Sequence, residues 1–116
     1  MNAAKQKGTA FEAAIVDYLN EHGWTRAERR ALNGAQDRGD IAGIAGLVIE
    51  AKNCKTLDLA GWLTELEVEI ANDHATTGVV VAKRRGKNVS QAYAILSFGS
   101  YCELLKLAGY GQGSQL

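Results

Sequence analysis

The sequence contains no proline, only two cysteines and no long apolar run. Without proline or a low-complexity block, it lacks the composition of a disordered chain or an extended linker. Cys54 and Cys102 match no CxxC metal motif, so we expect two free thiols in a reduced, cytoplasmic setting. No apolar run approaches the roughly 20 residues of a membrane span, and residues 1–8 contain no apolar segment typical of a secretion signal. We therefore expect no membrane partner.

A net charge is also missing, because 13 basic residues balance 13 acidic ones. Residues 56–82 contain several acids and neither Lys nor Arg, and the basic run 83–87 (Lys-Arg-Arg-Gly-Lys) follows at once. We expect an acidic and a basic surface to coexist, so DNA binding is not excluded, although its non-specific affinity should be modest at physiological salt. The basic residues that we predict to contact DNA are Lys5, Lys7, Arg29, Arg30, Arg38, Lys83, Arg84, Arg85 and Lys87.

Apolar residues at helical spacing predict three helices, and short β-branched or alternating runs predict five strands. The helices are expected at residues 4–22, at 58–74, and from Ser100, where Ser-x-x-Glu forms a capping box, to Gly109. The strands are expected at residues 24–32, 40–44, 47–52, 77–82 and 92–98, with a turn at Asn33-Gly34. This order predicts one α/β domain over residues 1–116, with helices flanking a mixed central β-sheet of about five strands. Residues 110–116 are expected to form a flexible tail.

The helix at 58–74 has an expected apolar stripe of Leu59, Leu63, Leu66 and Ile70, with Trp62 beside it. Most acids of this helix are expected on its other faces. We interpret the stripe as core, although an exposed part of it would serve a dimer interface.

Residues 40–52 place charges where apolar strands are predicted. Asp40 begins this segment, and Glu50 and Lys52 lie in its second apolar run. Charges inside such a strand are costly unless they are paired or bound to a metal. Because strand side chains alternate between faces, Glu50 and Lys52 share one face with Val48 and lie about 7 Å apart along the strand. This pattern is typical of a divalent-metal site that cuts phosphodiester bonds.

Magnesium prefers oxygen ligands, so the predicted ligands are Asp40, Glu50 and the backbone carbonyl of Ala51, with Mn²⁺ able to substitute. Glu12 is expected to approach the strand of Glu50 from the first helix and to complete the set directly or through water. The other interpretation of Glu12 is a capping box with Thr9. Lys52 should stay protonated beside two carboxylates, which favours positioning of water or stabilisation of charge over general-base chemistry.

Three motifs resemble those of the PD-(D/E)XK nuclease superfamily: residues 7–12 (Lys-Gly-x-x-Phe-Glu), 39–41 (Gly-Asp-Ile) and 50–52 (Glu-x-Lys). Within that superfamily the chain looks most like the archaeal and phage Holliday junction resolvases. The resemblance implies a restriction-endonuclease-like core in a homodimeric, magnesium-dependent endonuclease that nicks four-way DNA junctions and needs no organic cofactor. It also implies catalytic roles for Glu12, Asp40, Glu50 and Lys52.

Other functions remain open on the sequence. Those resolvases often carry a serine before the Gly-Asp pair, and residues 33–38 contain none. A nuclease of the same superfamily acting on linear duplex or flap DNA is therefore one alternative. The second is a DNA-binding module that keeps the fold without catalysis, and the third is an interaction protein in which the charged strand is an exposed edge.

Overall fold

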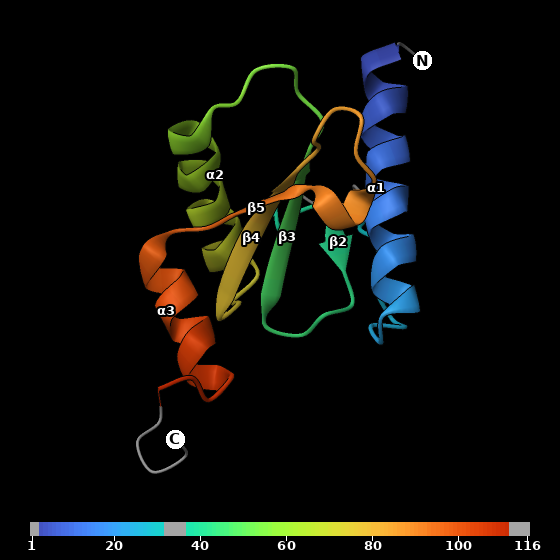
Figure 1. Cartoon of the computed structure of the whole chain (residues 1–116). Coiled ribbons are helices and arrows are strands. Elements are labelled where there is room, and N and C mark those ends of the chain that lie inside the picture. Colours follow the sequence, from blue (N-terminus) through green and yellow to red (C-terminus); the bar gives the residue numbers. More distant parts are fainter. Residues whose placement is uncertain (1–2, 32–36, 112–116) are drawn as a thin grey trace.

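In the described part of the chain, five strands form one mixed sheet and three α-helices flank it (Figure 1). The structure is a computed structural model that describes residues 3–31 and 37–111, with side chains from Gly8 onward. Along the chain the elements are α1 (Ala3–Glu21), β1 (Glu28–Arg29), β2 (Ile41–Ala42), β3 (Leu47–Lys52), α2 (Leu59–Asn72), β4 (Thr77–Ala82), the 3₁₀ turn η1 (Val89–Gln91), β5 (Tyr93–Ile95) and α3 (Phe98–Leu107). The predicted α/β class, the mixed five-stranded sheet and the element order are confirmed.

The strands follow one another across the sheet in the order β1-β2-β3-β4-β5. The central pair, β3 and β4, is parallel, and the other neighbouring pairs are antiparallel. Helix α2 makes the crossover between the parallel strands, as such a connection requires. Both central strands therefore end at the same edge of the sheet, where Lys52 is paired with Ala82. We call this the carboxyl edge.

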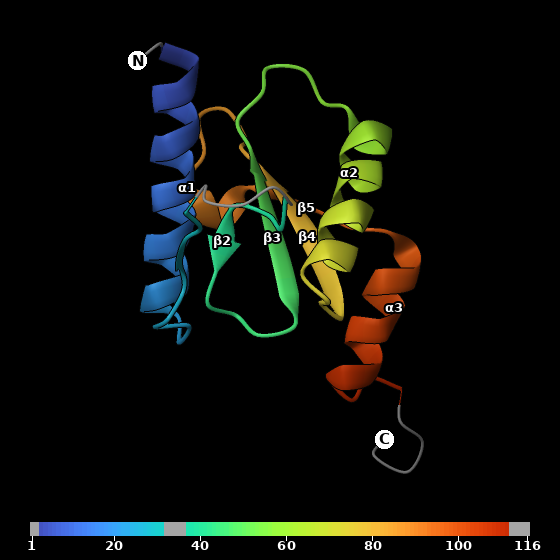
Figure 2. The same ribbon diagram turned by 180° about the vertical axis from the view of Figure 1, so that it is seen from behind.

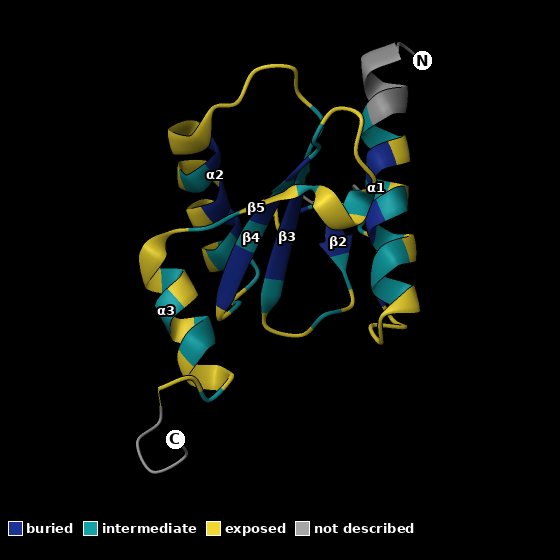
Figure 3. Ribbon diagram, in the orientation of Figure 1, coloured by how far each residue is buried: buried dark blue, intermediate teal, exposed yellow. Residues whose placement is uncertain are grey.

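The two faces of the sheet carry separate cores. On one face, α1 contributes Phe11 and Ile15, which pack with Ile49 of β3. On the other face, α2 contributes Trp62 and Leu66. Figures 1 and 2 show α1 and α2 on opposite sides of the strands, and Figure 3 shows the burial concentrated on β3, β4 and the facing sides of these helices. The alternation of β3 side chains thus assigns even-numbered residues to the α2 face and odd-numbered residues to the α1 face.

The apolar stripe of α2 matches the predicted one in three of its four residues, because Leu66 is buried and Leu63 and Ile70 pack against the same core. Leu59 is 49% exposed, whereas the buried residues of this helix are Trp62, Leu66 and Glu69. The helix begins after Asp58, whose carboxylate accepts a hydrogen bond from the N–H of Gly61. The prediction of Trp62 as core is confirmed, and the prediction of Leu59 as part of the buried stripe is wrong.

Three local predictions are also corrected. Strand β1 spans two residues instead of nine, as its many charges limit what it can bury. Helix α3 is capped by Ser97, whose hydroxyl accepts from the N–H of Ser100, so the helix starts before the predicted capping box and β5 is correspondingly shorter. Helix α1 starts at Ala3, which places Thr9 and Glu12 inside the helix and rules out their capping box. The predicted Asn33-Gly34 turn lies outside the described residues.

Helix α3 has no buried residue and lies at the end of the molecule away from the carboxyl edge (Figure 1). Cys54 and Cys102 are free thiols, as predicted. Among the helices of the described part of the chain, none is long and apolar enough to cross a membrane. The predicted tail beyond Gly111 is outside the described residues.

Candidate metal centre

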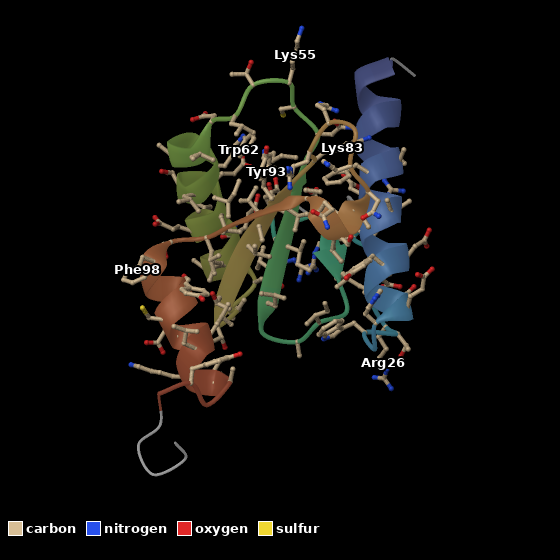
Figure 4. All side chains as sticks on the ribbon, viewed as in Figure 1. Arg26, Lys55, Trp62, Lys83, Tyr93 and Phe98 are labelled. Carbon is tan, nitrogen blue, oxygen red and sulfur yellow. The ribbon has the colours of Figure 1, made fainter. Side chains whose placement is uncertain are left out.

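Glu50 and Lys52 lie at the carboxyl end of β3 on the α2 face, as the alternation predicts. Glu50 is 7% exposed, and its Oε2 lies 3.5 Å from Lys52 Nζ. The ammonium group also donates to Glu65 Oε1 of α2 at 2.7 Å and lies 6.0 Å from the centre of the Trp62 ring. Figure 4 labels Trp62 on the side of the sheet that α2 covers. Two carboxylates and an aromatic face therefore hold this lysine in place.

The surroundings of Lys52 keep it charged. Burial alone would lower the pKa of the ammonium group, but the hydrogen bond to Glu65 and the charge of Glu50 raise the pKa above its ordinary value of 10.5. This agrees with the prediction that Lys52 stays protonated. A permanently charged ammonium group can donate hydrogen bonds and neutralise an anion, and it has no free electron pair with which to act as a base.

Three carboxylates gather beside this lysine. One oxygen each from Asp37, Glu50 and Glu69 lie within 4.8 Å of one another. Glu69 is only 1% exposed, and neither of its carboxylate oxygens receives a hydrogen bond; the same is true of Glu50 Oε1. Buried carboxylates that lie close together without hydrogen-bond donors destabilise the fold when they are ionised. A bound proton or cation would remove this cost. We call Asp37, Glu50 and Glu69 the acidic cluster.

The pKa values of Glu50 and Glu69 are raised, first by burial and then by neighbouring acids. Burial, followed by the charge of Asp40, raises the pKa of Glu50 from 4.5 to about 10. Burial also raises the pKa of Glu69 to about 8, with Asp37 contributing through its charge and by accepting a hydrogen bond from the protonated form. Without a cation, both glutamates therefore hold protons near neutral pH. A divalent cation would take the place of those protons.

The loop that carries Asp37 and Asp40 is shaped by Gly39. Its φ of 94° belongs to the left-handed region, and a Cβ there would come within 2.7 Å of a Val48 methyl group. Asp37 Oδ1 accepts from the N–H of Gly39, and Asp40 Oδ2 accepts from the N–H of Ala51 at 2.8 Å. Asp40 is thus held against β3 beside Glu50. The role of the Ala51 carbonyl as a metal ligand stays a prediction.

The end of α2 holds the same loop from the other side. Asn72 Nδ2 donates to the carbonyl of Asp37 at 2.8 Å. Asp73 lies 3.7 Å from Arg30, which precedes the loop, and 4.0 Å from Arg38, which lies within it. Helix α2 therefore supplies Glu65 and Glu69 to the site and also anchors the loop that supplies the aspartates.

Glu12 is placed elsewhere. Its carboxylate forms an ion pair with Arg29 of β1, with Glu12 Oε1 3.0 Å from Arg29 Nε. Helix α1 packs on the face of Ile49, opposite to the face that carries Glu50. The structure therefore brings Asp40, Glu50 and Lys52 together but does not add Glu12 to them. Its catalytic role stays a prediction.

Three acids of the site were not predicted: Asp37, Glu65 and Glu69. Glu69 had a signal, because it lies three and seven residues after Leu66 and Trp62, which places an acid on the buried stripe of α2. An acid at a core position of an amphipathic helix is expensive and indicates a partner across the interface.

The predicted DNA contacts fall into separate groups. Arg30 and Arg38 are engaged with Asp73, and Arg29 is engaged with Glu12. Lys83, Arg84 and Lys87 line a pocket at the carboxyl edge, and Arg85 is exposed beside it. Lys5 and Lys7 belong to α1, but their side chains lie outside the described residues.

Comparison of the chain with protein-family models, curated proteins and solved structures found no match.

Proposed function

We propose that the chain is a divalent-metal-dependent DNA endonuclease. The observation that carries the proposal is the acidic cluster: two buried carboxylates and an exposed one converge beside a lysine that is held in place. Sequence motifs draw attention to Asp40, Glu50 and Lys52. Glu69 lies on α2, and together with Asp37 and Glu50 it gives the end of β3 the composition of a metal site.

The residues that would hold the cation are Asp37, Glu50 and Glu69, with Asp40 beside them. Their fit to Mg²⁺ rests on oxygen donors and on the buried oxygens of Glu50 and Glu69 that receive no hydrogen bond. When bound, Mg²⁺ supplies an activated water and neutralises charge that builds up on the phosphate. Mn²⁺ should substitute for it, because it accepts the same ligands.

Lys52 has the charge and position to act on the scissile phosphate or on the attacking water. Its protonated Nζ lies 3.5 Å from Glu50, and the contact with Glu65 fixes its direction. A donor held in place before reaction costs no reorganisation in the transition state. We assign it stabilisation of developing negative charge and positioning of water.

The preferred substrate in this proposal is a four-way DNA junction cut by a homodimer. The support is the resemblance of residues 7–12, 39–41 and 50–52 to the Holliday junction resolvases of the PD-(D/E)XK superfamily, whose restriction-endonuclease-like core we propose for this fold. A two-fold dimer presents two active sites to two opposed strands, which matches the symmetry of the junction. Recognition would involve the shape and backbone of the arms more than the base sequence.

The test is cleavage of a labelled synthetic four-way junction in Mg²⁺, beside a linear duplex and a flap of the same sequence. Glu50→Gln should abolish cleavage and keep or improve DNA binding, because it removes a ligand charge and leaves the surface intact. Glu67→Gln, which makes the same change at an exposed acid of α2, is the matched control and should cut like the unaltered protein.

Each outcome assigns the activity. Symmetric nicks in the junction alone would support the resolvase. Cutting of duplex or flap would keep the nuclease and replace the substrate. DNA binding without any cutting would favour the inactive DNA-binding module, and no binding or cutting would favour the interaction protein.

A further inference from the structure

A pocket of about 380 Å³ lies at the carboxyl edge on the face opposite to the acidic cluster. Ala10, Phe11 and Ala14 of α1 form part of its apolar floor, and Lys83, Arg84 and Lys87 stand around it from the segment after β4. Figure 4 labels Lys83 at this end of the molecule beside α1. An apolar floor with clustered cations is the composition of a site for an anion that carries an apolar group.

The strand register explains why the pocket and the acidic cluster lie back to back. Ala82 is paired with Lys52 and packs with Trp62 on the α2 face. The next residue, Lys83, points to the α1 face because strand side chains alternate. Its backbone N–H donates to the carbonyl of Lys52 at 2.9 Å, so the two sites are joined by one main-chain hydrogen bond.

The cations of the pocket are not neutralised within the described part of the chain. Arg84 lies with its guanidinium carbon 5.4 Å from the centre of the Tyr93 ring and donates to the carbonyl of Gln91. Among the described residues, no carboxylate lies within ion-pair distance of Lys83, Arg84 or Lys87. Three like charges beside one cavity favour an anion there, and Arg84 is held in position before the anion arrives.

We propose that this pocket binds a nucleotide, with its phosphate against Lys83, Arg84 and Lys87 and its sugar and base over the floor formed with Phe11. Inorganic phosphate would satisfy the cations and leave the floor in water, whereas a nucleoside would cover it. The volume falls within the roughly 300–1,000 Å³ of small-molecule sites. The nucleotide is either free or an unpaired or terminal residue of a DNA strand, and the second source rests on the proposed function.

The experiment is a calorimetric titration of the full chain in EDTA with three probes: inorganic phosphate, dAMP and a short 5′-phosphorylated single-stranded oligonucleotide. We expect dAMP to bind about tenfold more tightly than phosphate, because it also buries the floor. Tighter binding of the oligonucleotide than of dAMP would assign the site to DNA strands. Weaker binding of the oligonucleotide than of dAMP would assign it to free nucleotides, and equal binding would show that a strand end and a free nucleotide fill the same site.

Two variants locate the binding. Lys83→Gln should weaken dAMP binding about tenfold, since one charge-assisted contact is lost. Ala10→Leu places bulk at an exposed helical position over the floor and should remove the preference for dAMP over phosphate. Lys55→Gln is the charge-matched control, because Lys55 is exposed on the β3–α2 loop at the same edge and does not line the pocket; it should bind dAMP unchanged.

The proposal would be overturned by dAMP binding no more tightly than phosphate, or by equal losses in Lys83→Gln and Lys55→Gln, which would indicate a diffuse charge effect. Because EDTA removes the metal, the result does not depend on cleavage. A protein that binds dAMP in the pocket and cuts nothing would keep this inference and lose the proposed function. The reverse result would lose only the pocket.

Discussion

The α2 face and the α1 face of the carboxyl edge rest on the same two strands and carry opposite chemistry. On the α2 face, Glu50 and Glu65 contact Lys52, and Glu50 also belongs to the acidic cluster, in which two carboxylates are buried. On the α1 face, three cations surround an apolar pocket. Consecutive residues belong to the two faces, because the side chain of Ala82 lies toward α2 and that of Lys83 lies toward α1. The two-residue period of strand side chains can therefore place a candidate cation site and a candidate anion site on opposite faces of one sheet.

This separation of charge explains how a chain of zero net charge could bind a polyanion. The molecule needs no basic surface all over if a metal ion binds the acidic cluster and phosphates bind the basic pocket. The two sites would then act on neighbouring parts of one polyanion, with the metal neutralising one and the pocket gripping the other.

The largest effect that we expect comes from removing the positive charge of Lys52 on the α2 face. Lys52→Met keeps the apolar stem beside Trp62 and should lower kcat on the preferred DNA by about 10²–10³-fold, as for loss of one preorganised donor. The dissociation constant for DNA should barely change. Single-turnover kinetics and a separate binding titration measure the two quantities. Lys55→Met is the control, and an unchanged rate in Lys52→Met would remove this lysine from the chemistry.

The second effect is on stability and has a counter-intuitive sign. Glu69→Gln replaces a buried acid, whose oxygens receive no hydrogen bond, by an amide of the same shape. Above about pH 8, where Glu69 is forced to ionise, the metal-free variant should melt several degrees higher than the unaltered protein. Thermal unfolding in EDTA measures this. A lower Tm would mean that the carboxylate makes a favourable contact and would contradict the account of the acidic cluster.

The third effect is the pH dependence of the metal-free protein. The pKa of Glu50 is raised to about 10 and that of Glu69 to about 8, from an ordinary value of 4.5. Between the ordinary and the raised pKa values, the folded state keeps protons that the unfolded state has lost. The free energy of unfolding should therefore fall as pH rises through this window. Denaturant titrations from about pH 5 to about pH 9 would detect it. A curve that rises across the same range would contradict it.

The smallest effect comes from loosening the loop of Asp37. Asn72→Ala removes the hydrogen bond to the Asp37 carbonyl and leaves every carboxylate present. Affinity for Mn²⁺ should fall by about threefold to tenfold, within the range for residues that support a metal ligand. Val68→Ala, at an exposed position on α2, serves as the control. Equal affinity in both variants would show that the loop needs no anchor.

Some of this arrangement could be predicted from local patterns. Strands β3 and β4 match their predicted bounds, because short runs of β-branched and apolar residues bounded by polar residues favour buried strands. The shared face of Glu50 and Lys52 follows from strand alternation alone. The proximity of Asp40 follows from the antiparallel pairing of β2 with β3.

The remainder depends on tertiary contacts. Glu69 joins the site only because α2 crosses over β3 with Trp62 and Leu66 inward. Most acids of this helix were expected on its other faces, and Glu69 departs from that expectation. Glu12 was expected near Glu50, but α1 packs on the other face of the sheet. The spacing of apolar residues in a helix shows which side of the helix is buried, and it does not show which face of a sheet the helix will cover. The start of α3 was missed because Ser97 and Ser100 both offer a capping hydroxyl, and the earlier one caps the helix.

The most direct measurement is a titration with Mn²⁺ monitored by electron paramagnetic resonance. It compares the unaltered protein with Glu69→Gln and Glu67→Gln. We expect the unaltered protein and Glu67→Gln to bind Mn²⁺ alike, and we expect Glu69→Gln to bind it at least about tenfold more weakly because one buried ligand charge is lost. Mn²⁺ binding that is absent from the unaltered protein, or equally strong in Glu69→Gln, would contradict the claim that the acidic cluster is a metal centre.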